Sequence, residues 1–149
     1  MERLKHKIVS IEQLSDVIKE TLNQYDEIML CYLYGSYAMG LQNQFSDIDT
    51  GIVLKNEFKT PPLYFASICS RIEEKFNYSI EIDLKILNDC TPRFLFQVIK
   101  NGIVIYSKDD YFRDEFTLRV IREYLDIKPM LDMFDRISIK EGLEYESKS

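Results

Sequence analysis

The chain has 149 residues, of which 46% are hydrophobic and 13% aromatic, a composition typical of a globular protein and not of a disordered one. Its formal net charge of −6 argues against direct binding to nucleic acid, because contacts to phosphate need clustered lysine and arginine side chains. No hydrophobic run approaches the ~20 residues of a membrane span and no signal sequence opens the chain, so we expect a single cytoplasmic domain over residues 1–149 with no membrane contact.

The predicted elements alternate between helices and strands along the chain. The first helix begins after Ser10, where Gln13 completes a capping box, and continues to about Asn23 with one apolar face. Thr91 followed by Pro92 is typical of another helix start, and Asn101-Gly102 is expected to end that helix in a left-handed conformation. The remaining predicted elements are strands at Glu27–Tyr34, Thr50–Leu54, Glu81–Ile86 and Ile103–Tyr106, and a helix from about Leu63 to Lys75.

A long helix is predicted to begin near Asp109 or Asp110 and to form a C-terminal helical segment at about 109–140. Its apolar residues before Asp126 are expected to pack on the core. The apolar residues after Pro129 exceed what a domain of this size needs, and monomers rarely expose large apolar patches. Core packing and a surface for homo- or hetero-oligomer formation both remain open for this second group, which comprises Met130, Leu131, Met133, Phe134 and Ile137.

The pattern that indicates function is Gly35-Ser36, a gap of ten residues, and then Asp47-Ile48-Asp49. Because side chains alternate along a strand, Asp47 and Asp49 are expected on one face with Ile48 on the other. Two carboxylates so close repel each other, and a divalent cation such as Mg²⁺ would relieve that repulsion. A Gly-Ser turn offers backbone N–H groups and a hydroxyl to phosphate, so the pattern predicts phosphoryl or nucleotidyl transfer.

A third acidic position, Asp83, lies within an apolar strand pattern next to Glu81 and Ile82. It is a candidate metal ligand and general base, but a salt-bridged residue on an edge strand would have the same sequence. Asp47 and Asp49 likewise have a structural alternative, since aspartates often face solvent at turns.

Together, Gly35-Ser36, Asp47, Asp49 and the Glu81–Leu84 segment resemble the minimal nucleotidyltransferases (MNT) of the polymerase-beta-like superfamily. The resemblance implies an α/β (α+β) fold with a small mixed β-sheet, with the carboxylates on one face and helices packed on the other. It also implies that Asp47, Asp49 and Asp83 hold two Mg²⁺ ions, and that Gly35 and Ser36 bind the triphosphate of ATP.

Many proteins of this kind are antitoxins of HEPN-domain toxins, and some transfer AMP to a tyrosine of the toxin. The resemblance therefore implies a Mg²⁺-dependent protein adenylyltransferase whose partner is a HEPN toxin. A non-catalytic antitoxin that acts by forming a complex remains an alternative. Transfer of AMP to a small molecule, such as an aminoglycoside, is a further one.

One position departs from the family pattern, because Met39 stands where an arginine often follows the Gly-Ser pair. Gly40 is retained, but no lysine or arginine occurs between Lys19 and Lys55. Charge on the triphosphate must then be met by metal, by backbone N–H groups, or by lysines from elsewhere, for which the candidates are Lys55, Lys59 and Lys85. Tyr37 could line the nucleotide pocket, whereas the only histidine, His6, is expected near a frayed end without a catalytic setting.

Overall fold

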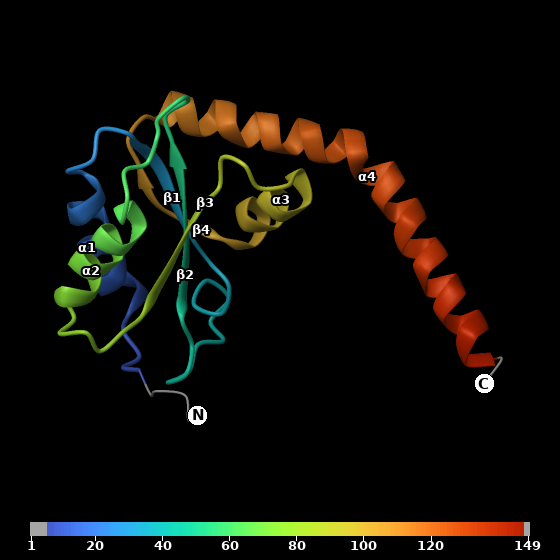
Figure 1. The fold of residues 1–149 in the computed structure, drawn as a ribbon, viewed down its shortest axis with the longest axis horizontal. Coiled ribbons are helices and arrows are strands. Elements are labelled where there is room, and N and C mark those ends of the chain that lie inside the picture. The colour runs from blue at the N-terminus through green and yellow to red at the C-terminus, as the bar shows by residue number, and fades with distance from the viewer. Residues whose placement is uncertain (1–5, 148–149) are drawn as a thin grey trace.

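The fold, seen in a computed structural model that describes residues 6–147 and the side chains of residues 6–142, is built on one four-stranded sheet (Figure 1). The strands are β1 (Ile28–Tyr34), β2 (Ile48–Leu54), β3 (Ile82–Ile86) and β4 (Ile103–Ser107), in the order β3-β2-β1-β4. β1 pairs antiparallel with β2 and with β4, whereas β2 and β3 are parallel. The predicted small mixed sheet is therefore confirmed.

Four helices connect and flank these strands: α1 (Ile11–Leu22), α2 (Tyr64–Glu74), α3 (Pro92–Asn101) and α4 (Asp110–Ser147). The predicted helix starts at Ser10 and Thr91 are confirmed by their caps. The Ser10 hydroxyl accepts a hydrogen bond from the Gln13 N–H at 3.1 Å, and the Thr91 hydroxyl accepts one from the Phe94 N–H at 3.3 Å. Each cap satisfies a backbone donor that the first helical turn leaves without a partner.

The helices cover both faces of the sheet, and in this detail the layers differ from the expected arrangement with helices on one face only (Figure 1). On one face, α1 and α2 pack against strand residues such as Ile48 and Ile52. On the other, Leu95 and Val98 of α3 and the first turns of α4 pack against Tyr32. Both layers cover β1 and β2, which are largely buried on both faces, and β1 accordingly carries an apolar or aromatic residue at every position.

Gly102 ends α3 for a different reason from the predicted one. Its φ of −87° and ψ of 175° are extended, not left-handed. A Cβ at this position would meet the carbonyl oxygens of Val98 and Leu33, the latter at 2.9 Å. Glycine is thus required because a Cβ would clash with the last turn of α3 as well as with β1.

α4 continues through Pro129 without interruption and extends beyond the rest of the molecule, with a change of direction near the transition from orange to red (Figure 1). Proline removes one backbone hydrogen bond and crowds the preceding turn, which accounts for the bend. Its first half packs on α3, where Tyr124 stacks on Phe96 with ring centroids 4.0 Å apart. Beyond Pro129 the exposed large hydrophobic residues are Met130, Met133, Phe134, Ile137 and Ile139. Within residues 6–147, no helix is both long and apolar enough to cross a lipid bilayer.

Gly51 provides a test of how tightly β2 packs under the helices of the second face. A Cβ there would lie 2.7–2.9 Å from the side-chain carbons of Leu87, which is fully buried. We expect Gly51→Ala to lower the free energy of unfolding by roughly 1–3 kcal/mol through overpacking, measured by urea denaturation. The control is Gly142→Ala, where a Cβ has no neighbour within 4 Å and helix propensity favours alanine by ~0.5–1 kcal/mol. Equal stability of Gly51→Ala and wild type would show that Leu87 can repack.

Candidate active site

Three aspartates gather at one end of the sheet, where β2 and β3 begin and β1 ends. Asp49 on β2 is directly beside Asp83 on β3 in the parallel register, and on its other side it is opposite Tyr34 of β1. Asp47 immediately precedes β2. In-register neighbours on parallel strands point their side chains to the same face, so the carboxylates of Asp49 and Asp83 lie side by side.

Gly35 directly follows β1 and lies under the carboxylate of Asp49. Its φ is +73°, a left-handed conformation that favours glycine. A Cβ at Gly35 would collide with Asp49 Oδ2 and lie 3.3 Å from its Cγ. The chain then makes a series of turns in which the Met39 N–H donates to the Gly35 carbonyl at 3.2 Å and the Leu41 N–H to the Ser36 carbonyl at 2.9 Å. Glycine at position 35 thus leaves room for the Asp49 side chain at the edge of this turn.

A hollow of about 330 Å³ opens between this turn and the loop that leads into β2, lined by Ser36, Asn43, Phe45, Ser46, Asp47 and Asp49. The structure therefore brings together three of the five residues selected from the sequence, with Gly35 and Asp83 adjoining Asp49. Sequence reasoning missed Asn43 and Phe45. Asn43 Oδ1 accepts a hydrogen bond from the Phe45 N–H at 2.8 Å, an Asx turn whose signal is an asparagine shortly before the Asp-x-Asp pattern.

The electrostatics of this end of the sheet are those of crowded carboxylates. Burial raises the pKa of Asp49, and the neighbouring charges of Asp83 and Asp47 raise it further, while Lys85 lowers it. Burial, followed by the neighbouring charges of Asp49 and Asp83, raises the pKa of Tyr34 to about 12. A cation among the aspartates would offset this repulsion, and a set of carboxylate oxygens is what Mg²⁺ prefers. The residues present therefore fit a magnesium site.

Of the three lysines considered as phosphate partners, Lys85 is the one on the aspartate face. It lies two residues beyond Asp83 on β3, so both side chains emerge on the same side. Its Nζ is 4.9 Å from the ring centroid of Phe94 on α3, and that ring packs edge-on against Tyr34 at 5.7 Å. Lys55 follows the last residue of β2, about 20 Å from Asp49 at ~3.3 Å per strand residue, with Lys59 in the turn beyond it.

Two sequence interpretations near the site are wrong. Tyr37 does not line the nucleotide pocket, because it is 1% exposed and belongs to the core under α1 and α2. His6 is not at a frayed end: its side chain is 12% exposed and its Nε2 lies 3.4 Å from Glu81 Oε2 and 3.8 Å from Asp47 Oδ1. Backbone pairing of the N-terminal segment, which leaves no periodic signal in the sequence, brings His6 there.

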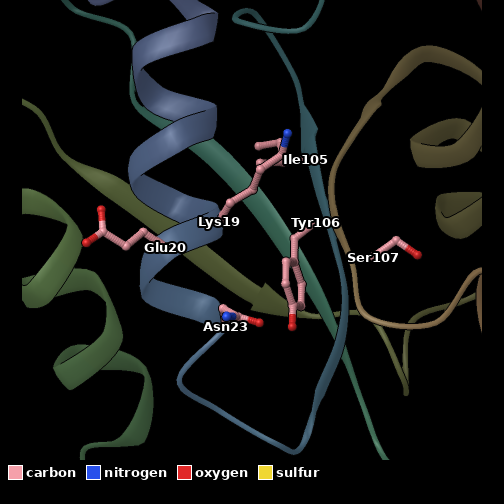
Figure 2. Close-up of a pocket in the computed structure, with 6 residues that line it drawn as sticks. All are labelled: Lys19, Glu20, Asn23, Ile105, Tyr106 and Ser107. Atoms are coloured by element: carbon pink, nitrogen blue, oxygen red, sulfur yellow. The ribbon is translucent and has the colours of Figure 1, made fainter.

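A separate hollow of about 380 Å³ lies between α1 and the edge strand β4, away from the aspartates (Figure 2). Figure 2 shows Tyr106 facing Asn23 across this groove, with Glu20 pointing away from it. The Tyr106 hydroxyl is buried and has no hydrogen-bond partner among the described residues. The groove brings together no group of carboxylates, so it does not compete with the aspartate cluster as a catalytic site.

A sequence profile described as "Polymerase beta, Nucleotidyltransferase" matches residues 16–111, well over half of the chain and all of the elements that build this site. The chain belongs to this nucleotidyltransferase family. The match includes the Gly-Ser turn and Asp47, Asp49 and Asp83. Comparison of the nucleotidyltransferase with curated proteins finds no matching relative.

Several solved structures with the same fold are chains of toxin–antitoxin complexes. A chain of a toxin–antitoxin crystal structure with AMP-PNP is 19% identical, with a TM-score of 0.66 over 83% of this nucleotidyltransferase and 98% of that chain. A chain of the tri-AMPylated Shewanella oneidensis HEPN toxin in complex with MNT antitoxin is 16% identical, with a TM-score of 0.63 over 85% and 98% of the two chains. A chain of the MntA–HepT toxin–antitoxin pair is 16% identical, with a TM-score of 0.62 over the same shares. At these identities the likeness shows the polymerase-beta-like fold, which confirms the fold predicted from the sequence.

The raised pKa of Asp49 predicts a stability cost that depends on pH. When the pKa of an acid is raised in the folded state, protonation of that acid favours folding. This contribution to the free energy of unfolding is complete below the ordinary pKa, ~3.9 for aspartate, and is lost as the pH rises through the raised pKa. In EDTA at pH 7 we therefore expect Asp49→Asn to unfold at a higher temperature than wild type. The difference should disappear below about pH 3.9.

Scanning calorimetry from pH 3 to 8 measures this difference. Asp16→Asn, at an exposed aspartate of α1 outside the cluster, is the matched control and should leave the unfolding temperature unchanged. A wild type as stable as Asp49→Asn at pH 7 without metal would contradict the crowding of the carboxylates.

Proposed function

We propose that this nucleotidyltransferase transfers AMP from ATP to a hydroxyl group, a tyrosine, of a partner HEPN-domain toxin and so acts as its antitoxin in the cytoplasm. The observation that carries the proposal is the in-register pair Asp49 and Asp83, with Asp47 beside it and the Gly35-Ser36 turn beneath. The AMP-PNP complex and the tri-AMPylated toxin among the proteins of similar fold support ATP as the substrate and a toxin as the acceptor.

Asp47, Asp49 and Asp83 would hold the magnesium. When bound, Mg²⁺ neutralises charge on the triphosphate and lowers the pKa of the acceptor hydroxyl. Ser36 and the backbone N–H groups of the turn after Gly35 bind phosphate oxygens on the wall of the hollow. The acceptor oxygen forms a bond to the α-phosphorus, the bond from that phosphorus to pyrophosphate breaks, and the carboxylate of Asp83 takes the hydroxyl proton.

The partner is expected on the second half of α4. The exposed side chains Met133, Phe134 and Ile137 form a flexible apolar surface there, and such patches are uncommon on monomers. The ion pair between Arg93 of α3 and Asp135 of α4, at 3.4 Å, keeps this half of the helix next to α3. α3 in turn contacts the aspartate face through Phe94. A toxin bound to α4 would thus lie on the same side of the sheet as the aspartates.

A second function, neutralisation of the toxin by binding alone, has one observation in its favour. Met39 is 59% exposed where the family pattern has an arginine, and no cation occurs from position 20 to 54. Lys85 is the cation available on the aspartate face to offset this loss.

The two functions are separated by incubation of the protein with ATP and Mg²⁺, with and without the HEPN-domain partner, followed by intact-protein mass spectrometry. We expect the partner to gain one or more AMP units. Asp49→Asn should lower the rate by at least about 10²–10³-fold, because the charge arrangement that stabilises the transition state is lost. The same variant should still bind the partner, as judged by size-exclusion chromatography. A partner that is silenced without gaining AMP would leave binding as the function.

Substitution of Lys85 provides a second test of the proposal that the protein transfers AMP. We expect Lys85→Met, which keeps the aliphatic stem over Phe94, to lower kcat/KM for ATP roughly 10- to 100-fold, since one charge-assisted contact is worth about 1.5–3 kcal/mol. Lys85→Arg should recover most of the activity. Lys59→Met is the matched control and should behave as wild type. Equal activity of Lys85→Met and wild type would assign the triphosphate charge to metal and backbone alone.

A further inference from the structure

His6, Asp47 and Glu81 come from three separate segments and direct one nitrogen and two oxygen donors toward a common point. His6 Nε2 is 3.4 Å from Glu81 Oε2 and 3.8 Å from Asp47 Oδ1, and the three donor atoms all lie within 4.8 Å of one another. The exposed fractions of the side chains rise from 12% for His6 to 39% for Asp47 and 63% for Glu81. The group is therefore buried on the imidazole side and open to solvent on the carboxylate side.

Backbone hydrogen bonds hold these three segments together. The His6 N–H donates to the Gln44 carbonyl in the loop before β2, and the Lys7 N–H donates to the Ser79 carbonyl before β3 at 2.8 Å. Val9, 3% exposed, anchors the segment in the core. The Ile48 N–H donates to the Glu81 carbonyl at 3.0 Å, which fixes the residue after Asp47 beside Glu81. The donors are thus arranged by the fold before any ligand binds.

The two separations from His6 Nε2 are longer than a hydrogen bond; they suit an ion pair when the imidazole is protonated and ligands around one ion when it is neutral. An N–H···O hydrogen bond spans about 2.7–3.2 Å between heavy atoms, shorter than both distances from His6 Nε2. Two ligands at ~2.1 Å from a tetrahedral zinc ion are about 3.4 Å apart, close to the separation between His6 and Glu81. A small inward rotation of Asp47 would complete three protein ligands, with water in the fourth position.

We propose that His6, Asp47 and Glu81 form a binding site for a divalent transition-metal ion, Zn²⁺, separate from the magnesium ligands Asp49 and Asp83. An imidazole nitrogen favours zinc over Mg²⁺, which prefers oxygen ligands only. Two carboxylates balance the charge of the ion. Thiolates do not compete for the zinc, because burial raises the pKa of Cys31 to about 12 and of Cys69 to about 11, and it also raises the pKa of Cys90.

Asp47 belongs to both sites, so zinc would control the transferase. This consequence, unlike zinc binding itself, rests on the proposed function. An ion bound between His6 and Glu81 draws the Asp47 carboxylate toward the N-terminal segment and away from Asp49. Transfer of AMP should then fall as zinc occupancy rises, at constant Mg²⁺ and ATP.

Zinc binding can be measured cleanly because His6 is the only histidine of the chain. On untagged protein, one imidazole signal set is expected in a ¹H–¹⁵N spectrum, and Zn²⁺ should shift its Nε2 resonance at one equivalent. A Zn²⁺ titration against a chromophoric chelator gives the affinity. We expect His6→Ala and Glu81→Gln each to weaken binding at least tenfold, a loss typical of altered metal shells. Asp49→Asn and Asp83→Asn should bind zinc as wild type does.

Glu81→Gln is the decisive variant, because its side chain is largely exposed and the backbone bonds of the N-terminal segment stay intact. Zinc should inhibit AMP transfer by wild type but not by Glu81→Gln. Absence of zinc binding by wild type, or equal binding by wild type, His6→Ala and Glu81→Gln, would overturn the site. Zinc binding that needs His6 and Glu81 in a protein that transfers no AMP would support the site and count against the proposed function alone.

Discussion

Parallel pairing of β2 with β3 places Asp49 directly beside Asp83, and the two carboxylates repel each other. The other residues at this end of the sheet accommodate or offset this repulsion. The arrangement raises the pKa of Asp49, so the ionised site costs free energy in the folded protein. Gly35 leaves space for the Asp49 carboxylate, and Lys85 offsets part of its charge. The magnesium proposed for this site would offset the repulsion that remains between the carboxylates.

The sequence alone was sufficient for the elements that carry this pairing. Apolar runs that are interrupted at the Gly-Ser and Asp-x-Asp residues predict strand β2 and the place of these residues. The hydroxyl side chains of Ser10 and Thr91 predict the two helix caps. The expectation of a mixed sheet depends on the family resemblance and not on periodicity, and the strand order was not predicted, because no local pattern specifies which strand pairs with β3. The assignment of roles to the aspartates stays a prediction, as does the single domain over residues 1–149.

The errors share a physical cause, since each concerns a residue whose place depends on a distant backbone. Gly102 is glycine because the carbonyl of Leu33, from a distant strand, approaches it together with that of Val98. Tyr37 is buried because the turn after Gly35 folds back on the core under α1 and α2. His6 reaches the aspartates through main-chain bonds to Gln44 and Ser79, which any residue at position 6 could make. Contacts made by the main chain leave no trace in hydrophobic periodicity. The main-chain bonds place position 6 beside the aspartates, and the imidazole of His6 provides the metal-binding nitrogen there.

The proline within α4 has a mechanical consequence. Beyond Pro129, where one helical hydrogen bond is missing, the helix is held to α3 through the exposed Arg93–Asp135 pair, and such pairs contribute at most about 1 kcal/mol. The direction of the part of α4 after Pro129 therefore costs little free energy to change. Thermal motion can alter it, and burial of a few apolar side chains against a partner can fix it. A helix that bends at this point lets one rigid domain contact partners of somewhat different shape, while the ion pair at Asp135 links the start of the distal half to α3.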